Sequence, residues 1–333
     1  MLTRRQLLTA SAAGLVCAAA GGPLRALAQT SAPVINKPVR IIVGFPAGGG
    51  TDVIARILAD RLRGPYASTV LVENKPGAAA RLAVEHVKNS EGDGSTMLFT
   101  PDFPITLYPH SFRSLNYDSL RDFTPVAPAA KSMLTYNIGP AVPESVKTLA
   151  QYVEWCKANP AKAAYGTTSA GGTPHFVGLM LANEAHVPMS AVHYRGGAPA
   201  LQDLIGGHVP ASVNPISESM TQAKAGTIRI LAVTGARRSS FLPDVPTMSE
   251  AGFNVVVQSW LGVFVSSKTP PEIVNALGAA IGAAVKSPQM IENLSQVGNE
   301  PWFQTPAEFA ATVRADVARW GPVVKASGFV AED

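Results

Sequence analysis

From residue 39 onward, short apolar runs alternate with segments in which apolar residues recur every three or four positions. Residues 39–43 form a β-branched run typical of a buried strand, and the next segment places Ile54, Leu58 and Leu62 on one helix face. The same two patterns predict further strands and helices at residues 70–72, 81–88, 96–99, 163–165, 174–185, 191–193, 199–205, 209–213, 217–225, 228–233 and 261–265. This alternation is typical of an α/β fold, and we expect mainly parallel sheets flanked by helices.

The predicted elements fall into two α/β units, and no segment resembles a flexible linker between them. A chain of 333 residues has room for about two domains of ordinary size. The last segment has too few strands for a third α/β domain, so we expect it to return to the first unit. The prediction is a discontinuous domain 1 at residues 33–129 and 260–333, with domain 2 at 130–259 inserted through two crossovers.

The composition supports a large apolar core. Hydrophobic residues make up 47% of the chain and charged residues 15%, against about 25% charged in average proteins, which excludes an intrinsically disordered chain. The formal net charge is +4, but residues 1–28 contain three arginines and no acidic residue, so the remaining chain carries only +1. Such a small charge gives no support to a nucleic-acid partner.

Residues 1–28 have the pattern of a signal peptide. A basic start precedes an apolar run at 7–20 and an Ala-Leu-Ala cleavage pattern that ends at Ala28. The apolar run is too short for a transmembrane helix, which needs about 20 residues. The pair Arg4 and Arg5 before two leucines resembles a twin-arginine signal, and the alternative is a Sec signal that contains paired arginines. Both interpretations predict export from the cytoplasm.

The two cysteines limit the covalent chemistry of the exported chain. Cys17 lies in the apolar run, and the residues before it lack the small side chains of a lipoprotein cleavage site. Cleavage after Ala28 leaves only Cys156, so we expect no internal disulfide and no cysteine-based zinc site. The histidines show no metal-ligand spacing, and we predict neither a metal nor a cofactor.

The most distinctive loop is the glycine-rich segment 44–52 between the first predicted strand and the first predicted helix. Glycines let backbone N–H groups approach a ligand, and the helix start adds a partial positive charge, so this loop predicts an anion site. A phosphate-binding P-loop requires lysine where Gly50 stands, and a dinucleotide fingerprint requires glycine where Val53 stands. The remaining alternative is a turn that only lets the strand enter the helix.

Two further loops have the same position between a strand and a helix. Residues 166–175 are rich in hydroxyls, and Ser169 is one residue away from the spacing of a hydrolase nucleophile elbow, so an exported serine hydrolase is the competing function. We interpret His175 in this loop as an orienting or packing residue. The third loop, at 193–207, directs backbone N–H groups toward the carboxyl edge of the predicted sheet, where open α/β sheets bind ligands.

Five segments in order along the chain resemble one known family. They are residues 43–56, 72–78, 117–126, 194–207 and 242–253, beginning with Val-Gly-Phe-Pro-Ala-Gly-Gly-Gly-Thr-Asp. They are similar to the tripartite tricarboxylate transporter substrate-binding proteins, the Bug-type receptors, over nearly the whole exported chain. The resemblance implies a type II, periplasmic-binding-protein-like clamshell of two domains. It also implies a periplasmic receptor, expected as a monomer, that hands a small organic carboxylate to the membrane permease subunits of such a transporter.

The resemblance also implies which residues hold the ligand. In this family the first glycine loop and the hydroxyl-rich loop grip a carboxylate from opposite lobes. We therefore expect ligand contacts from Phe45, Ala47, Gly48, Gly49 and Thr51 in domain 1, from Ser169, Gly171, Gly172 and Thr173 in domain 2, and from Tyr194, Gly196 and Gly197 in the third loop.

Two polar positions affect the expected ligand. Asn214 stands where the family pattern often has an aspartate that recognises an amino group, so the resemblance disfavours an amino-acid ligand. Asp102 follows a predicted strand and pairs with a cation or a hydroxyl, or serves only as a turn or cap residue. The sequence thus predicts a periplasmic solute-binding receptor, not an enzyme, that closes around its ligand at a hinge. The alternatives are an exported hydrolase that uses Ser169 and a signalling receptor without its own permease.

Overall fold

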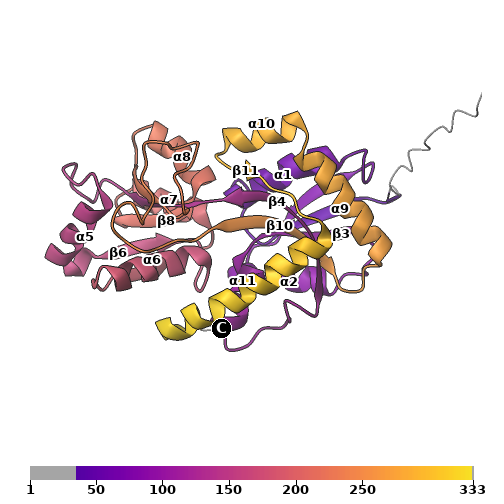
Figure 1. Cartoon of the computed structure of the whole chain (residues 1–333), viewed down its shortest axis with the longest axis horizontal. Helices are drawn as coiled ribbons and strands as arrows, with labels where there is room; N and C mark the ends of the chain where they lie inside the picture. The colour runs from indigo at the N-terminus through magenta and orange to yellow at the C-terminus, as the bar shows by residue number, and fades with distance from the viewer. Residues whose placement is uncertain (1–34, 332–333) are drawn as a thin grey trace, which may run out of the picture. The chain divides into compact units, whose positions relative to one another are not determined.

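The computed structural model describes residues 35–331, so the predicted signal peptide, with Arg4, Arg5 and Cys17, lies outside the described residues. The described chain folds into two β-sheets, each flanked by helices (Figure 1). None of the described helices combines the length and the apolar character needed to cross a membrane.

The first sheet has six strands in the order β11-β4-β10-β3-β1-β2. The strand bounds are Val39–Val43 for β1, Val70–Asn74 for β2, Thr96–Pro101 for β3, Phe123–Ser132 for β4, Ser259–Ser266 for β10 and Glu300–Pro301 for β11. The helices of the same segments are α1 Gly50–Leu62, α2 Arg81–Lys88, α3 Phe103–Thr106, α4 Tyr108–Ser111, α9 Pro271–Val285, α10 Pro288–Gln296 and α11 Pro306–Ser327, with a short 3₁₀ helix at Ala78–Ala80.

The second sheet has five strands in the order β7-β6-β8-β5-β9. The strand bounds are Leu134–Ile138 for β5, Ala164–Thr167 for β6, Ser190–His193 for β7, Ala211–Pro215 for β8 and Arg229–Val233 for β9. Its helices are α5 Leu149–Ala158, α6 Thr173–Glu184, α7 Gly197–Ile205 and α8 Ile216–Lys224, with a 3₁₀ helix at Pro160–Lys162. Cys156 in α5 is buried and free.

The alternation of side chains along β1 explains how helices cover both faces of the first sheet. Ile41 packs in one core with Ile54 and Leu58 of α1, whereas Ile42 packs in a second core with Val84 of α2. Neighbouring residues of a strand point to opposite faces, so the continuous apolar run buries both faces of β1. This packing fixes the first turn of α1 beside the carboxyl end of β1.

Both sheets are mixed, but most strands of each sheet run in one direction, as expected. The returning strand β10 runs antiparallel to β3 and β4, and β5, which enters the second sheet, runs antiparallel to β8 and β9. The sequence pattern does not predict β4, because Pro125 and Pro128 interrupt it. The structure accommodates these prolines at register shifts of the β4–β10 pairing, opposite Gly262 and Phe264.

The chain passes between the two sheets twice. Met133 is the only residue between β4 and β5, and residues 234–258 lead from β9 to β10. The predicted domain limit at 129/130 falls inside β4, and the limit at 259/260 follows the first residue of β10. The division into domains at these limits stays a prediction.

Candidate ligand-binding site

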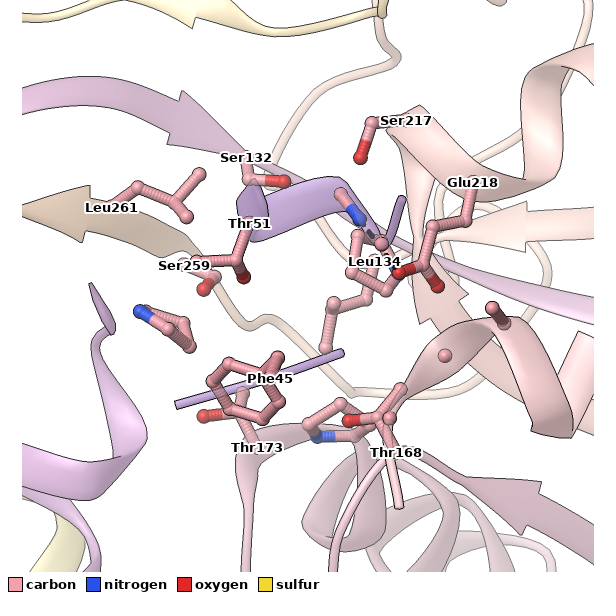
Figure 2. Close-up of a pocket in the computed structure, with 18 of the residues that line it drawn as sticks. Phe45, Thr51, Ser132, Leu134, Thr168, Thr173, Ser217, Glu218, Ser259 and Leu261 are labelled. Carbon is pink, nitrogen blue, oxygen red and sulfur yellow. Dashed lines mark hydrogen bonds between the residues drawn. The ribbon is translucent and has the colours of Figure 1, made fainter. Parts of the chain in front are cut away.

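A cavity lies where four helices of the described chain begin (Figure 2). The first turns of α1, α6, α7 and α8 all contribute to its wall. The lining residues come from the segments of both sheets. They are Phe45, Pro46, Gly49, Gly50, Thr51, Pro101, Phe103, Ser132, Leu134, Thr168, Thr173, Pro174, Gly196, Gly197, Ala198, Pro199, Pro215, Ser217, Glu218, Ser259 and Leu261.

The four helix starts each direct a partial positive charge toward the cavity. The first N–H groups of a helix have no acceptor within the helix and carry a partial positive charge. Within the lining that the structure describes, no side chain is lysine, arginine or histidine. An anion in this cavity is therefore held by backbone dipoles and neutral donors rather than by a fixed countercharge.

Three hydroxyls of the wall are free to donate to such an anion. Those of Thr51, Thr168 and Ser217 make no hydrogen bond to any other residue in the range 35–331, and Figure 2 shows all three around the cavity. Thr51 and Ser217 also belong to first helical turns, so hydroxyl and backbone donors lie together at the starts of α1 and α8.

Asp52 holds the glycine loop against the start of α1. Its Oδ2 accepts a hydrogen bond from the Gly48 N–H at 2.9 Å, and its Oδ1 accepts from Arg56 Nη2 and Asn74 Nδ2, both at 2.9 Å. Burial alone raises the pKa of Asp52, but these hydrogen bonds outweigh burial and lower the pKa below its usual value. Gly48 has a φ of 81°, which favours glycine. The ionised Asp52 thus fixes the turn that brings Gly49 to the cavity wall.

The hydroxyl-rich loop is anchored behind the cavity wall. Ser169 is buried, and its Oγ accepts a hydrogen bond from the Tyr108 hydroxyl at 3.3 Å. The Gly171 N–H donates to Nδ1 of His175 at 3.2 Å, and burial lowers the pKa of His175 to about 3. His175 therefore orients the loop as a neutral imidazole. Over residues 35–331 no histidine is hydrogen-bonded to Ser169, so the geometry does not support the hydrolase alternative.

Asp102 lies behind the cavity and holds two of its hydroxyls. Its Oδ1 accepts a hydrogen bond from Ser259 Oγ at 2.6 Å, and its Oδ2 accepts from Thr173 Oγ1 at 3.0 Å. Burial raises the pKa of Asp102 to about 6, although the two hydrogen bonds act in the opposite direction. The partners of Asp102 are thus hydroxyls of the protein itself, and both belong to residues of the cavity wall.

Glu218 lines the cavity but is not among the residues predicted from the sequence. Its Oε1 accepts a hydrogen bond from the Gly50 N–H at 3.0 Å, and its Oε2 accepts from Asn214 Nδ2 at 3.0 Å. Asn214 Nδ2 also donates to the Gly197 carbonyl at 3.2 Å, so the buried Asn214 lies behind Glu218. Burial raises the pKa of Glu218 against the effect of these hydrogen bonds. The sequence could have indicated Glu218 as a site residue, because it lies in the first turn of a predicted helix that follows a predicted strand.

The structure brings only part of the predicted contact set to the cavity wall. The predicted residues that line the cavity are Phe45, Gly49, Thr51, Thr173, Gly196 and Gly197. The predicted residues that do not line it are Ala47 and Gly48, exposed at the loop tip, the buried Asp102, Ser169, Gly171, Gly172 and Asn214, and Tyr194, whose hydroxyl donates to Asp203 Oδ2 at 2.7 Å.

Two further hydroxyls of the wall have no signal in the sequence. Ser132 ends β4 and Ser259 begins β10, and the two residues are partners in the antiparallel ladder. Their proximity depends on a strand pairing across more than a hundred residues, in a strand that the sequence pattern does not predict. Pattern alone therefore does not locate them.

Comparisons with known proteins agree with this fold. A family model described as the tripartite tricarboxylate transporter family receptor matches residues 54–329. A relative from Cupriavidus necator, the UPF0065 protein in the gbd 5' region, is 33% identical over 314 residues, which are 92% of this chain and 94% of that protein.

Two solved structures extend the comparison to three dimensions. The R. palustris protein Rpa4515 with adipate has a TM-score of 0.84 at 31% identity, covering 88% of this chain and 98% of that chain. MatC from Rhodopseudomonas palustris with bound malate has a TM-score of 0.80 at 26% identity, covering 86% of this chain and 98% of that chain.

These matches confirm both the predicted clamshell and the resemblance seen in the sequence. The two mixed sheets with their helices form the two-domain α/β clamshell of periplasmic binding proteins. The family consists of solute-binding receptors rather than enzymes. The chain belongs to the tripartite tricarboxylate transporter receptor family.

Proposed function

We propose that this protein is a periplasmic receptor that captures a small organic carboxylate by hinge closure and delivers it to a membrane permease of the tripartite tricarboxylate type. The observation that carries the proposal is the convergence of four helix starts on a cavity whose described lining has no basic side chain. Two relatives of the same fold hold carboxylates, adipate in one and malate in the other.

The rest of the wall suits the carbon skeleton of such a ligand. Phe45, Phe103 and Leu134 provide apolar surface between the polar groups, as in most small-molecule sites. Backbone N–H groups and hydroxyls hold a carboxylate without a fixed positive charge that would oppose its release. Binding without a fixed countercharge suits a receptor that must release its ligand to a permease.

Hinge closure is supported by hydrogen bonds that link the segments of one sheet to those of the other around the cavity. The Gly50 N–H at the start of α1 donates to Glu218 of α8, and Thr173 of α6 donates to Asp102 after β3. Each bond joins a segment of the six-stranded sheet to a segment of the five-stranded sheet. Both bonds require the two sheets to be close, so they stabilise the closed arrangement.

Calorimetry on the protein purified after export tests the ligand class. Titrations with mono-, di- and tricarboxylates, and with a neutral sugar as negative control, should give heats of binding for carboxylates only. A carboxylate at 100 times its Kd should stabilise the fold by about 2.7 kcal/mol, and mass spectrometry should recover it unchanged. Tight binding of the sugar, or turnover of the acid, would contradict the proposal.

A matched pair of variants tests the site. Thr51→Val removes a free hydroxyl from the cavity wall, and Thr221→Val makes the same change at an exposed position of α8 outside the wall. Loss of one hydrogen bond to a carboxylate should weaken binding by roughly tenfold or more in Thr51→Val alone. Equal affinities in the two variants would place the ligand elsewhere.

Delivery and location need cellular measurements. Fractionation should find the protein in the periplasm, and deletion of its gene should abolish uptake of the identified carboxylate at low concentration. Uptake that does not depend on the protein would favour the alternative of a signalling receptor without its own permease.

A further inference from the structure

Glu218 is the one charged side chain in the cavity lining that the structure describes. It projects from the first turn of α8, and its Oε1 meets the Gly50 N–H at the start of α1 at 3.0 Å. A Cβ on Gly197 would overlap the Glu218 carboxylate, so the start of α7 is equally close. Figure 2 shows Glu218 beside Ser217, with Ser259 and Leu261 across the cavity.

This carboxylate occupies a position that suits a ligand anion. The N–H groups at a helix start attract negative groups, and Glu218 already satisfies the first N–H of α1. A ligand carboxylate at the same corner would face a like charge in a partly buried site, which is unfavourable. The ligand's carboxylate therefore belongs beside the free donors of Thr51 and Thr168 and not against Glu218.

A second acceptor position lies across the cavity at Ser259 and Thr173. Each hydroxyl has one proton and gives it to Asp102, at 2.6 Å and 3.0 Å. With Asp102 ionised, these two oxygens offer only lone pairs to a ligand. The wall thus contains hydrogen-bond acceptors in two places, the Glu218 carboxylate itself and the two hydroxyls backed by Asp102.

Glu218 also has unused capacity to accept hydrogen bonds. A carboxylate has about four lone-pair sites, and Gly50 and Asn214 supply one donor each to Glu218. Burial raises the pKa of Glu218, which means that its ionised form is under-solvated and would gain from a further donor. Asn214 orients this carboxylate from behind, so an amino group can be recognised without an aspartate at position 214.

We propose, on the basis of the function proposed above, that the ligand is a carboxylate that also bears a hydrogen-bond donor, either a hydroxyl or an ammonium group. Glu218 accepts this donor and excludes a second ionised carboxylate from its corner. Glu218 is thus a specificity residue of the site.

Matched ligand series test this selection on the wild-type protein. One series contains butanoate, its hydroxy and amino derivatives substituted at C2 or at C4, and succinate; the second is the corresponding six-carbon series ending in adipate. By calorimetry at pH 8, a hydroxy or amino acid should bind roughly tenfold or more tighter than the plain acid, and the diacid should bind most weakly. A preference for ammonium over hydroxyl would indicate an ion pair, and equal preference a neutral hydrogen bond; both outcomes support the proposal.

The variant Glu218→Gln assigns the selection to this residue. It keeps an oxygen acceptor for the Gly50 N–H but removes the charge, so the preference for the donor should fall by roughly tenfold and the diacid should bind more tightly. Glu292→Gln, at an exposed position of α10, is the matched control and should leave the ranking of ligands unchanged. Thermal melts check that both variants fold.

The outcomes separate this inference from the proposed function. If carboxylates bind but the wild type prefers the plain acid or the diacid, or if folded Glu218→Gln keeps the wild-type ranking, the role of Glu218 is overturned. If no carboxylate of either series or of the wider panel binds, the proposed function fails as well. The wild-type ranking needs no variant, so an unfolded Glu218→Gln protein would not prevent the test.

Discussion

Thr173 donates a hydrogen bond to Asp102 across 3.0 Å, and this bond joins the first residue of α6 to the residue that follows β3. Asp102 is fully enclosed and accepts a second bond from Ser259, yet burial still raises its pKa to about 6 from 3.8. The protein therefore keeps a carboxylate whose ionisation is unfavourable directly behind its ligand site. The free energy of unfolding should therefore depend on pH through Asp102.

Asp102→Asn should remove this dependence. A folded pKa above the unfolded value means that the contribution of Asp102 to stability is fully present below pH 3.8 and is lost as the pH rises through about 6. The difference in unfolding free energy, wild type minus Asp102→Asn, should therefore fall by roughly 2 kcal/mol between pH 4 and pH 7.5. Urea unfolding at both pH values measures it. Asp244→Asn, at an exposed position, is the control and should show no such change.

His175 should act in the opposite direction. Burial lowers its pKa to about 3 from 6.5, so its contribution to stability is present above pH 6.5 and is lost as the pH falls toward 3. Nitrogen NMR should find a neutral imidazole with the proton on Nε2 at pH 5, because Nδ1 accepts from the Gly171 N–H. His175→Asn keeps an acceptor and should be less sensitive to acid, by roughly 3 kcal/mol between pH 7 and pH 4. An imidazolium at pH 5 in the folded protein would contradict this prediction.

Two neighbouring glycines should separate stability from binding. Gly48→Ala places a side chain at a φ of 81° on an exposed turn and should cost about 1 kcal/mol of stability with affinity retained. Gly49→Ala has an ordinary φ of −74° and no contact closer than 3.4 Å, so the fold should be unaffected. Gly49 lines the cavity, and its new methyl group should weaken carboxylate binding by roughly tenfold. Thermal melts and calorimetry on both variants should give this reciprocal pattern; full affinity in Gly49→Ala would mean that the loop only turns the chain.

Export should depend on Arg4 and Arg5. Replacing both with lysine keeps the charge of the predicted signal peptide but removes the guanidinium pair that a twin-arginine receptor recognises. Periplasmic accumulation, followed by immunoblotting of cell fractions, should then fall to background. Normal accumulation of the lysine variant would indicate the Sec pathway instead.

Local pattern predicts the elements near the site well. The predicted bounds of β1 and α2 coincide with the observed Val39–Val43 and Arg81–Lys88, because each has an uninterrupted apolar period. β4 escapes prediction because its two prolines break the pattern, and β5 follows it after one residue. The antiparallel pairing comes from β10, which returns from the second sheet, and from β5, so the mixed order could not be predicted from local pattern.

The site residues likewise include some that local pattern predicts and others that it does not. Glycine loops before helices are visible in the sequence, and three of them supply Gly49, Thr173 and Gly197 to the cavity. The sequence also points to Asn214, but only the structure shows that its amide donates hydrogen bonds to Glu218 and to the Gly197 carbonyl. A side chain's direction depends on its tertiary neighbours, so residues behind the wall cannot be distinguished from residues in it by spacing.

Met133 alone separates β4 from β5, and its carbonyl oxygen accepts a hydrogen bond from the Ile216 N–H at 3.0 Å. One residue offers only two rotatable backbone bonds to a pivot, whereas the return passage at 234–258 is long enough to follow any path that the first passage sets. Ser132 and Leu134, on either side of Met133, both belong to the cavity wall. In the hinge closure proposed above, this one-residue passage is therefore flanked on both sides by the cavity wall, so a substitution at Ser132 or Leu134 should alter the opening motion as well as the hold on the solute.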